Sequence, residues 1–124
     1  MQAETRIIHG SFKDGTAVDV TLSKADLHIG MRRSRLISEA QQANQDEQDI
    51  DMALLRFLYA DVAAATISVD RHVDGAIEAV PVPLSFETFC DLSDTTGAQL
   101  EQTIYQLNSH WIGETKQERE DPKG

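Results

Sequence analysis

The segment that most constrains the fold is residues 49–66, with the sequence DIDMALLRFLYADVAAAT. Its apolar residues recur at the 3.6-residue period of an α-helix, and additional apolar residues widen the stripe well beyond one face. Acidic residues gather at its start, where carboxylates favour the positive end of a helix dipole. Because one neighbour could not cover so broad a surface, we expect a central helix with packing partners on more than one side.

The residues before this helix predict a β-hairpin and a first helix. Residues 5–22 contain Asp14-Gly15, a dipeptide typical of tight hairpin turns. After the turn, apolar and polar residues alternate with the period of a half-buried strand. Ser23 is the expected N-cap of a first helix over residues 24–40.

The residues after the central helix are more irregular. Residues 67–83 combine β-branched residues, a second Asp-Gly pair and two prolines, so we expect an extended excursion there, at most a loose hairpin. A short helix over residues 86–92 follows. A last helix begins at Asp94 or Thr95 and carries a clean amphipathic stripe to Trp111.

Together these elements predict one α+β domain that is mainly α. An N-terminal β-hairpin is followed by three to four helices packed around the central apolar helix. We place this domain at residues 1–113 and expect residues 114–124 to be a flexible polar tail. A chain of 124 residues is long enough for one domain with a small core.

Composition excludes several classes of function. The formal net charge of −10 would repel DNA and RNA overall. The single cysteine, Cys90, permits neither an internal disulfide nor a zinc site with several thiolates. The N-terminus lacks the apolar core of a signal peptide, and no apolar run approaches the ~20 residues that cross a bilayer. We therefore expect a soluble cytosolic protein without membrane contact.

No residue pattern indicates catalysis or a cofactor. The four histidines are scattered along the chain and match no metal-binding spacing. A glycine-rich phosphate loop is missing. Cys90 lies on a short amphipathic segment, where a buried and inert thiol is the expectation. We expect no catalytic residues, no metal, no cofactor and no enzyme activity.

Apolar surface is the more informative feature. The breadth of the central helix and the aromatic residue near the end of the last helix suggest more apolar surface than a small monomer hides. We place a partner-binding groove between these two helices. Its candidate residues are Leu54, Leu58, Leu100, Ile104, Leu107 and Trp111. The alternative for each of them is a place in the core of the monomer.

A basic run interrupts this acidic chain in LHIGMRRSRLISEA, residues 27–40. Arg32, Arg33 and Arg35 permit three interpretations: a nucleic-acid site, a solvated helix face, or an electrostatic contact with another protein or subunit. Three cations do not outweigh a chain this acidic, so we favour the solvated face. The spacing of Arg35 and Glu39 allows an i,i+4 ion pair worth only a few tenths of a kcal/mol.

The order of these elements resembles a known protein family. LSKADLHIGM follows the hairpin, and ALLRFLYADVAAAT, an Asp-Gly excursion, FCDLSD and LEQTIYQLNSHW come after it. Over about residues 5–113 this order is similar to that of the tail assembly chaperones encoded by long-tailed phages and prophages. The resemblance is one of pattern and includes no catalytic motif.

The resemblance implies a non-enzymatic role in assembling phage tails. Such chaperones bind the long, helical tape measure protein and keep it from aggregating before the tail tube polymerises. It also implies a place in the host bacterial cytoplasm, absence from the mature virion, and a longer form of the same chain made by ribosomal frameshifting. A homo-oligomer is a separate expectation, which follows from the spare apolar surface. Two other functions remain open: a structural head–tail connector or tail component, and a small nucleic-acid-binding regulator.

Overall fold

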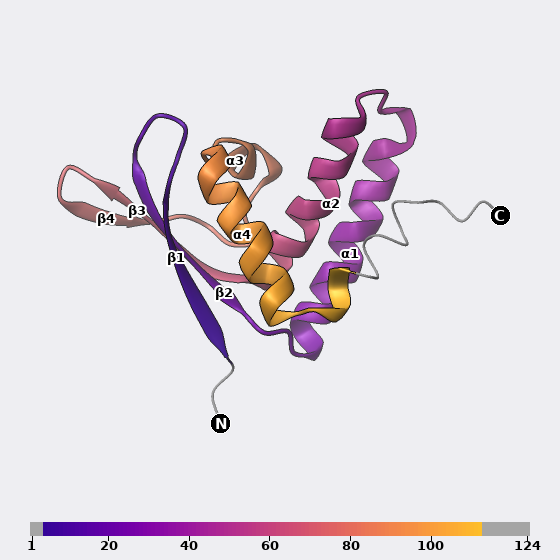
Figure 1. The fold of residues 1–124 in the computed structure, drawn as a ribbon, viewed down its shortest axis with the longest axis horizontal. Coiled ribbons are helices and arrows are strands. Elements are labelled where there is room, and N and C mark those ends of the chain that lie inside the picture. Colours follow the sequence, from indigo (N-terminus) through magenta and orange to yellow (C-terminus); the bar gives the residue numbers. More distant parts are fainter. Residues whose placement is uncertain (1–3, 113–124) are drawn as a thin grey trace.

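The computed structural model describes residues 4–112, which form a four-stranded antiparallel sheet with helices packed on one side of it (Figure 1). In chain order the elements are β1 (Thr5–Ser11), β2 (Ala17–Ser23), α1 (Leu27–Ala43), a short 3-10 turn η1 (Asn44–Asp46), α2 (Ile50–Ala65), β3 (Thr66–Val73), β4 (Ala76–Ala79), α3 (Phe86–Cys90) and α4 (Asp94–Leu107). The strands follow one another across the sheet as β1-β2-β3-β4.

The expectation of a mainly α fold with a lone N-terminal hairpin is wrong. β3 begins directly after α2 and pairs antiparallel with β2, which places Val20 opposite Val69. β3 then turns through Asp74 and Gly75 into β4, so the excursion expected over residues 67–83 adds two strands to the sheet. The physical reason is that two strands alone are barely stable, and β2 gains a partner on each of its edges.

The turn expected at Asp14-Gly15 is confirmed. Gly15 has a φ of 92°, a left-handed conformation that glycine adopts without a steric penalty. The amide of Phe12 donates to the carbonyl of Thr16 across this turn at 2.8 Å. Phe12 itself is buried and forms an isolated bridge with Leu92, so the end of the hairpin is held against the loop before α4.

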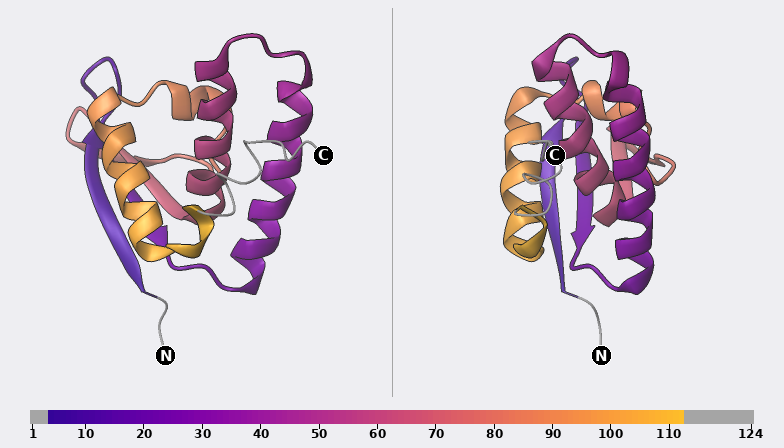
Figure 2. Two further views of the ribbon diagram at one scale, coloured as in Figure 1. Left: turned by 45° about the vertical axis from the view of Figure 1, so that its right-hand side comes forward. Right: turned by 90° about the vertical axis from the view of Figure 1, so that its right-hand side faces the viewer.

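The first helix starts later than expected, at Leu27. Its N-cap is Asp26, whose Oδ1 accepts a hydrogen bond from the amide of Ile29 at 2.8 Å. Ser23 was the wrong choice of cap because it still belongs to β2, where its hydroxyl donates to the carbonyl of Lys24 at 2.9 Å. In Figure 2, α1 and α2 stand side by side as a helical hairpin, with the C-terminal half of α2 buried.

The last helix ends earlier than expected, at Leu107. Asn108 is almost completely buried, and its Oδ1 accepts a hydrogen bond from the amide of Ala25 at 2.8 Å. This bond ties the end of α4 to the segment between β2 and α1. Trp111 follows on a separate turn and is buried as well. The expected flexible tail, residues 114–124, lies outside the described residues.

One core connects the sheet and the helices. Val18, Val20 and Leu22 alternate along β2 and are fully buried beneath the helices, whereas the residues between them are partly exposed on the opposite face. Within residues 4–112, no helix combines the length and the apolar character needed to span a membrane.

Candidate functional site

The six residues expected to line a groove divide into two groups. Leu100 and Ile104 are completely buried in the core, and Leu107 and Trp111 are nearly so. Because these four side chains are buried, they cannot contact a partner in this conformation. Their positions agree with the alternative interpretation, in which each belongs to the core of the monomer. The other two lie on α2, where Leu54 is 40% exposed and Leu58 is partly buried against the core.

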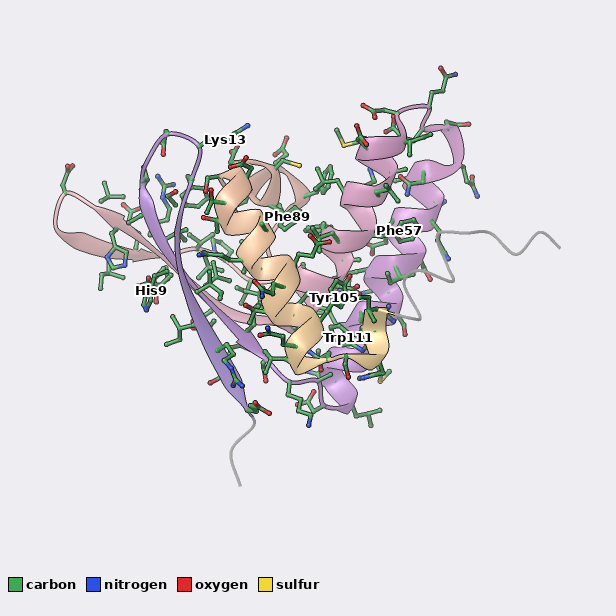
Figure 3. All side chains as sticks on the ribbon, in the orientation of Figure 1. His9, Lys13, Phe57, Phe89, Tyr105 and Trp111 are labelled. Carbon is green, nitrogen blue, oxygen red and sulfur yellow. The ribbon has the colours of Figure 1, made fainter. Side chains whose placement is uncertain are left out.

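A groove does lie between α2 and α4, nearer the start of α4 than the expected position. It has a volume of about 450 Å³ and also borders α3. Its apolar lining consists of Leu55, Leu58, Phe89, Cys90, Leu92 and Ala98. In Figure 3, Phe89 and Lys13 lie near the upper end of α4, and Lys13 is one of the polar residues beside this groove.

Small residues on α4 make this hollow. Gly97 and Ala98 face the groove, across from leucines of α2. A Cβ added at Gly97 would have no atom within 4 Å, so the space above this residue is open. Ser93 caps the helix by accepting from the amide of Thr96, which holds the first turn of α4 in place at the groove.

The groove is apolar inside and acidic at its margin. Asp94 and Glu101 are exposed at the α4 side. Lys13 forms an ion pair with Asp91 at 3.6 Å, so the nearest cation is already paired. Burial raises the pKa of the Cys90 thiol above its ordinary value of 9.0, and a thiol that stays protonated is a poor nucleophile.

A buried ionic cluster joins α1, α2 and α4 at the other end of α4. Arg33 Nε donates to Asp61 Oδ1 at 2.6 Å, with side chains that are only 8% and 0% exposed. The hydroxyl of Tyr105 donates to the other carboxylate oxygen at 2.5 Å. The guanidinium also lies 5.1 Å from the ring centroid of Trp111, and Figure 3 shows Tyr105 and Trp111 close together there. This cluster ties Tyr105 and Trp111 to α1 and α2.

The three arginines of residues 27–40 therefore do not form one free basic face. Arg33 is buried in the cluster. Arg32 donates to the carbonyl of Ala64 at 3.3 Å, at the end of α2. The expected i,i+4 pair of Arg35 with Glu39 is confirmed, at 3.2 Å and well exposed. Each arginine therefore has an intramolecular partner.

Polar side chains also meet on the open face of the sheet. Asp19 of β2 accepts hydrogen bonds from His9 of β1 at 2.7 Å and from His72 of β3 at 2.8 Å. These two bonds, that from His72 first, lower the pKa of Asp19 below its ordinary value of 3.8. Over residues 4–112, no group of three or more His, Cys, Asp or Glu side chains is arranged to hold a metal ion.

Sequence reasoning missed Asp61 and the true groove lining. Asp61 is a single carboxylate inside the alanine-rich part of α2, and a lone acid on a buried helix face signals a buried cationic partner. The sequence signal for a groove at Gly97 and Ala98 is weaker, because small residues on a helix leave a hollow only where larger side chains of a neighbouring element surround them. Comparison with known proteins adds nothing to this geometry, since no family model, curated protein or solved structure matches the chain.

Proposed function

We propose that this protein is a phage tail assembly chaperone that binds the tape measure protein and keeps it soluble while the tail is built. The observation that carries the proposal is the apolar groove between α2, α3 and α4. The likeness in the order of elements to tail assembly chaperones gives the proposal its client. No enzyme activity, cofactor or metal is part of it.

The groove fits the apolar stripe of a helix. A client helix exposes large aliphatic side chains at i, i+3, i+4 and i+7, and such helices dock by inserting those anchors into a groove. The leucines of α2 form one wall of the groove and the small residues of α4 form the other. Exposed Leu54 extends the apolar surface of α2 next to Leu55.

The charge around the groove selects a basic client helix. Asp94 and Glu101 border the groove, and the whole chain carries a net charge of −10. A stripe flanked by lysine or arginine would complement this margin and would be drawn to it at low ionic strength. Binding would then add negative charge to a client that otherwise aggregates, which favours solubility.

A single groove of this size gives weak binding. Each fully buried aliphatic anchor contributes about 1.5–3 kcal/mol, and association costs at least about 4 kcal/mol in lost freedom of motion. The free energy gained by burying a few anchors therefore exceeds the cost of association only slightly. A long client with many stripes compensates for this, because successive sites act together. Weak individual sites also allow the chaperone to leave when the tube polymerises.

The test is co-expression with the tape measure protein encoded in the same genome. We expect the wild-type chain to keep the client in the soluble fraction and to co-purify with it. Gly97→Leu fills the open space in the groove and should abolish both effects. Gly30→Leu is the matched control, because Gly30 is also helical and also has no atom within 4 Å of an added Cβ, but it lies on α1.

Two results would reject the proposal. One is an unchanged solubility of the client with no complex in the presence of the wild-type chain. The other is full client protection by Gly97→Leu, which would remove the groove from the binding site. Mass spectrometry of purified virions separates a chaperone from a tail component, since the proposed chaperone acts in the host cytoplasm and is left out of the particle. The same cell extracts would reveal a frameshifted long form.

A further inference from the structure

A second candidate surface lies along β1, at the open edge of the sheet. β1 is the first strand in the sheet order, and in the left view of Figure 2 it runs down the left side of the molecule with α4 beside it. Edge strands invite pairing with another strand unless prolines, charges or bulges block them. β1 has the sequence TRIIHGS, with no proline, one charged residue and a regular register against β2.

The hydrogen bonds at the start of β1 show which peptide groups point outward. The amide of Lys24 donates to the carbonyl of Glu4 at 2.8 Å. Alternation in an antiparallel ladder then directs the peptide groups of Arg6 and Ile8 toward β2, and those of Ile7 and His9 toward the open edge. Among the described residues, the outward groups of Ile7 and His9 have no hydrogen-bond partner.

The two ends of this edge differ. At the C-terminal end, Ser11 is closed off by α4, because its amide donates to Thr96 Oγ1 at 2.9 Å and its carbonyl accepts from the amide of Ser93 at 3.0 Å. At the N-terminal end, the carbonyl of Thr5 accepts from the exposed side chain of Arg6, at 3.0 Å. The available edge is therefore centred on Ile7, with one outward residue on each side of it.

We propose that β1 pairs antiparallel with β1 of a second copy of this chain, about a twofold axis at Ile7. This register places Ile7 opposite Ile7 and Thr5 opposite His9. All three outward residues are then used, in about six new hydrogen bonds. It also covers Ile7, whose side chain is 56% exposed. Pairing centred on His9 is blocked because it requires Ser11, which α4 already occupies.

The chemistry around the edge fits a second copy of an acidic chain. Between β1 and α4 lies a hollow of about 350 Å³, and its α4 side is formed by Gln99, Gln102 and Thr103, all uncharged. Two chains that each carry a charge of −10 repel each other over most approaches. Along this strip the pairing sets Arg6 opposite Ile8, and each Arg6 is already paired with Glu4 of its own chain at 2.7 Å.

The experiment measures mass by light scattering during size-exclusion chromatography, over a range of protein concentrations. We expect the wild-type chain to approach twice 13.8 kDa as concentration rises. Ile7→Lys and Ile7→Glu each place like charges opposite each other at the axis, so each alone should remain at 13.8 kDa. An equimolar mixture of the two should recover the doubled mass, because opposite charges then face each other.

The matched control is Ile77→Lys, which alters an exposed apolar residue of the other edge strand, β4, where Ile77 is 66% exposed. It should leave the doubled mass unchanged. Circular dichroism and thermal melting identify any variant that has lost its fold. A wild-type chain that stays at 13.8 kDa throughout would overturn the proposal. So would a dimer that survives Ile7→Lys, or one that Ile77→Lys also dissociates.

Discussion

Removing the buried partner of Arg33 should cost this small protein much of its stability. The perturbation is Asp61→Leu, which replaces a completely buried carboxylate by an apolar side chain with the same number of heavy atoms. The substitution leaves the guanidinium of Arg33 and the hydroxyl of Tyr105 without the acceptor that both use, at 2.6 and 2.5 Å.

The magnitude follows from burial. Breaking a buried ion pair from one side costs about 3–5 kcal/mol, because a charge is left desolvated and uncompensated. A domain of this size has a total stability of about 5–15 kcal/mol. At about 4 °C per kcal/mol, the loss lowers Tm by roughly 12–20 °C. Arg35→Met, which breaks only the exposed pair with Glu39, should cost less than about 0.5 kcal/mol.

The assay is urea denaturation followed by circular dichroism, repeated for a variant in which the whole cluster is apolar. Arg33→Met combined with Asp61→Leu and Tyr105→Phe removes both the charge of Arg33 and the hydroxyl of Tyr105. This combination should recover most of the stability, since apolar replacements of buried pairs are often neutral. A loss below about 1 kcal/mol for Asp61→Leu alone would refute the reasoning, as would no recovery in the combined variant.

Four further substitutions test other parts of the structure. Gly97→Leu and Gly30→Leu should each raise the free energy of unfolding by about 0.5–1 kcal/mol, because both replace a helical glycine in open space; a large loss in urea denaturation would show that the space is filled. Gly10→Ala should cost about 1–3 kcal/mol, since its Cβ would lie 2.5 Å from the buried side chain of Thr96; an unchanged Tm would contradict this. Asp19→Asn tests pH dependence. Because the pKa of the carboxylate is lowered in the folded protein, its hydrogen bonds stabilise the fold at a pH above 3.8 and lose this effect as the carboxylate is protonated. The difference in Tm between Asp19→Asn and wild type should therefore shrink as pH falls from 6 to 3.

Local sequence signals predicted the local parts of this fold. The Asp14-Gly15 turn, the apolar helix over residues 49–66 and the start of the last helix at Asp94 each depend on a few neighbouring residues. The same kind of signal failed at Ser23, where a plausible helix cap competes with a strand that continues through the residue. The choice between these depends on pairing with β1, which is a distant contact.

The sheet and the groove depend on distant contacts throughout. Residues 67–83 carried strand-forming residues, but nothing in that segment shows that β3 pairs with β2 across two intervening helices. Likewise Leu100 and Ile104 have the spacing of either a core or a binding surface. Only their neighbours in space decide between these roles. Because α4 packs on the sheet, both residues are buried in the core.

α4 carries three different surfaces, and their separation links the two proposals. Its buried side includes Leu100 and Ile104, its groove side includes Gly97 and Glu101, and its edge side includes Gln99. Pairing through β1 therefore leaves the groove uncovered, and a dimer presents two grooves to a client with repeated stripes.

Two linked sites on one repeated client bind more tightly than one, because the second contact is intramolecular. Ile7→Lys should therefore weaken binding to a two-stripe client peptide but leave binding to a one-stripe peptide unchanged in isothermal titration calorimetry. Gly97→Leu should weaken both equally. If Ile7→Lys weakened the one-stripe peptide as well, the edge would be part of the groove's own binding site rather than a separate means of joining two grooves.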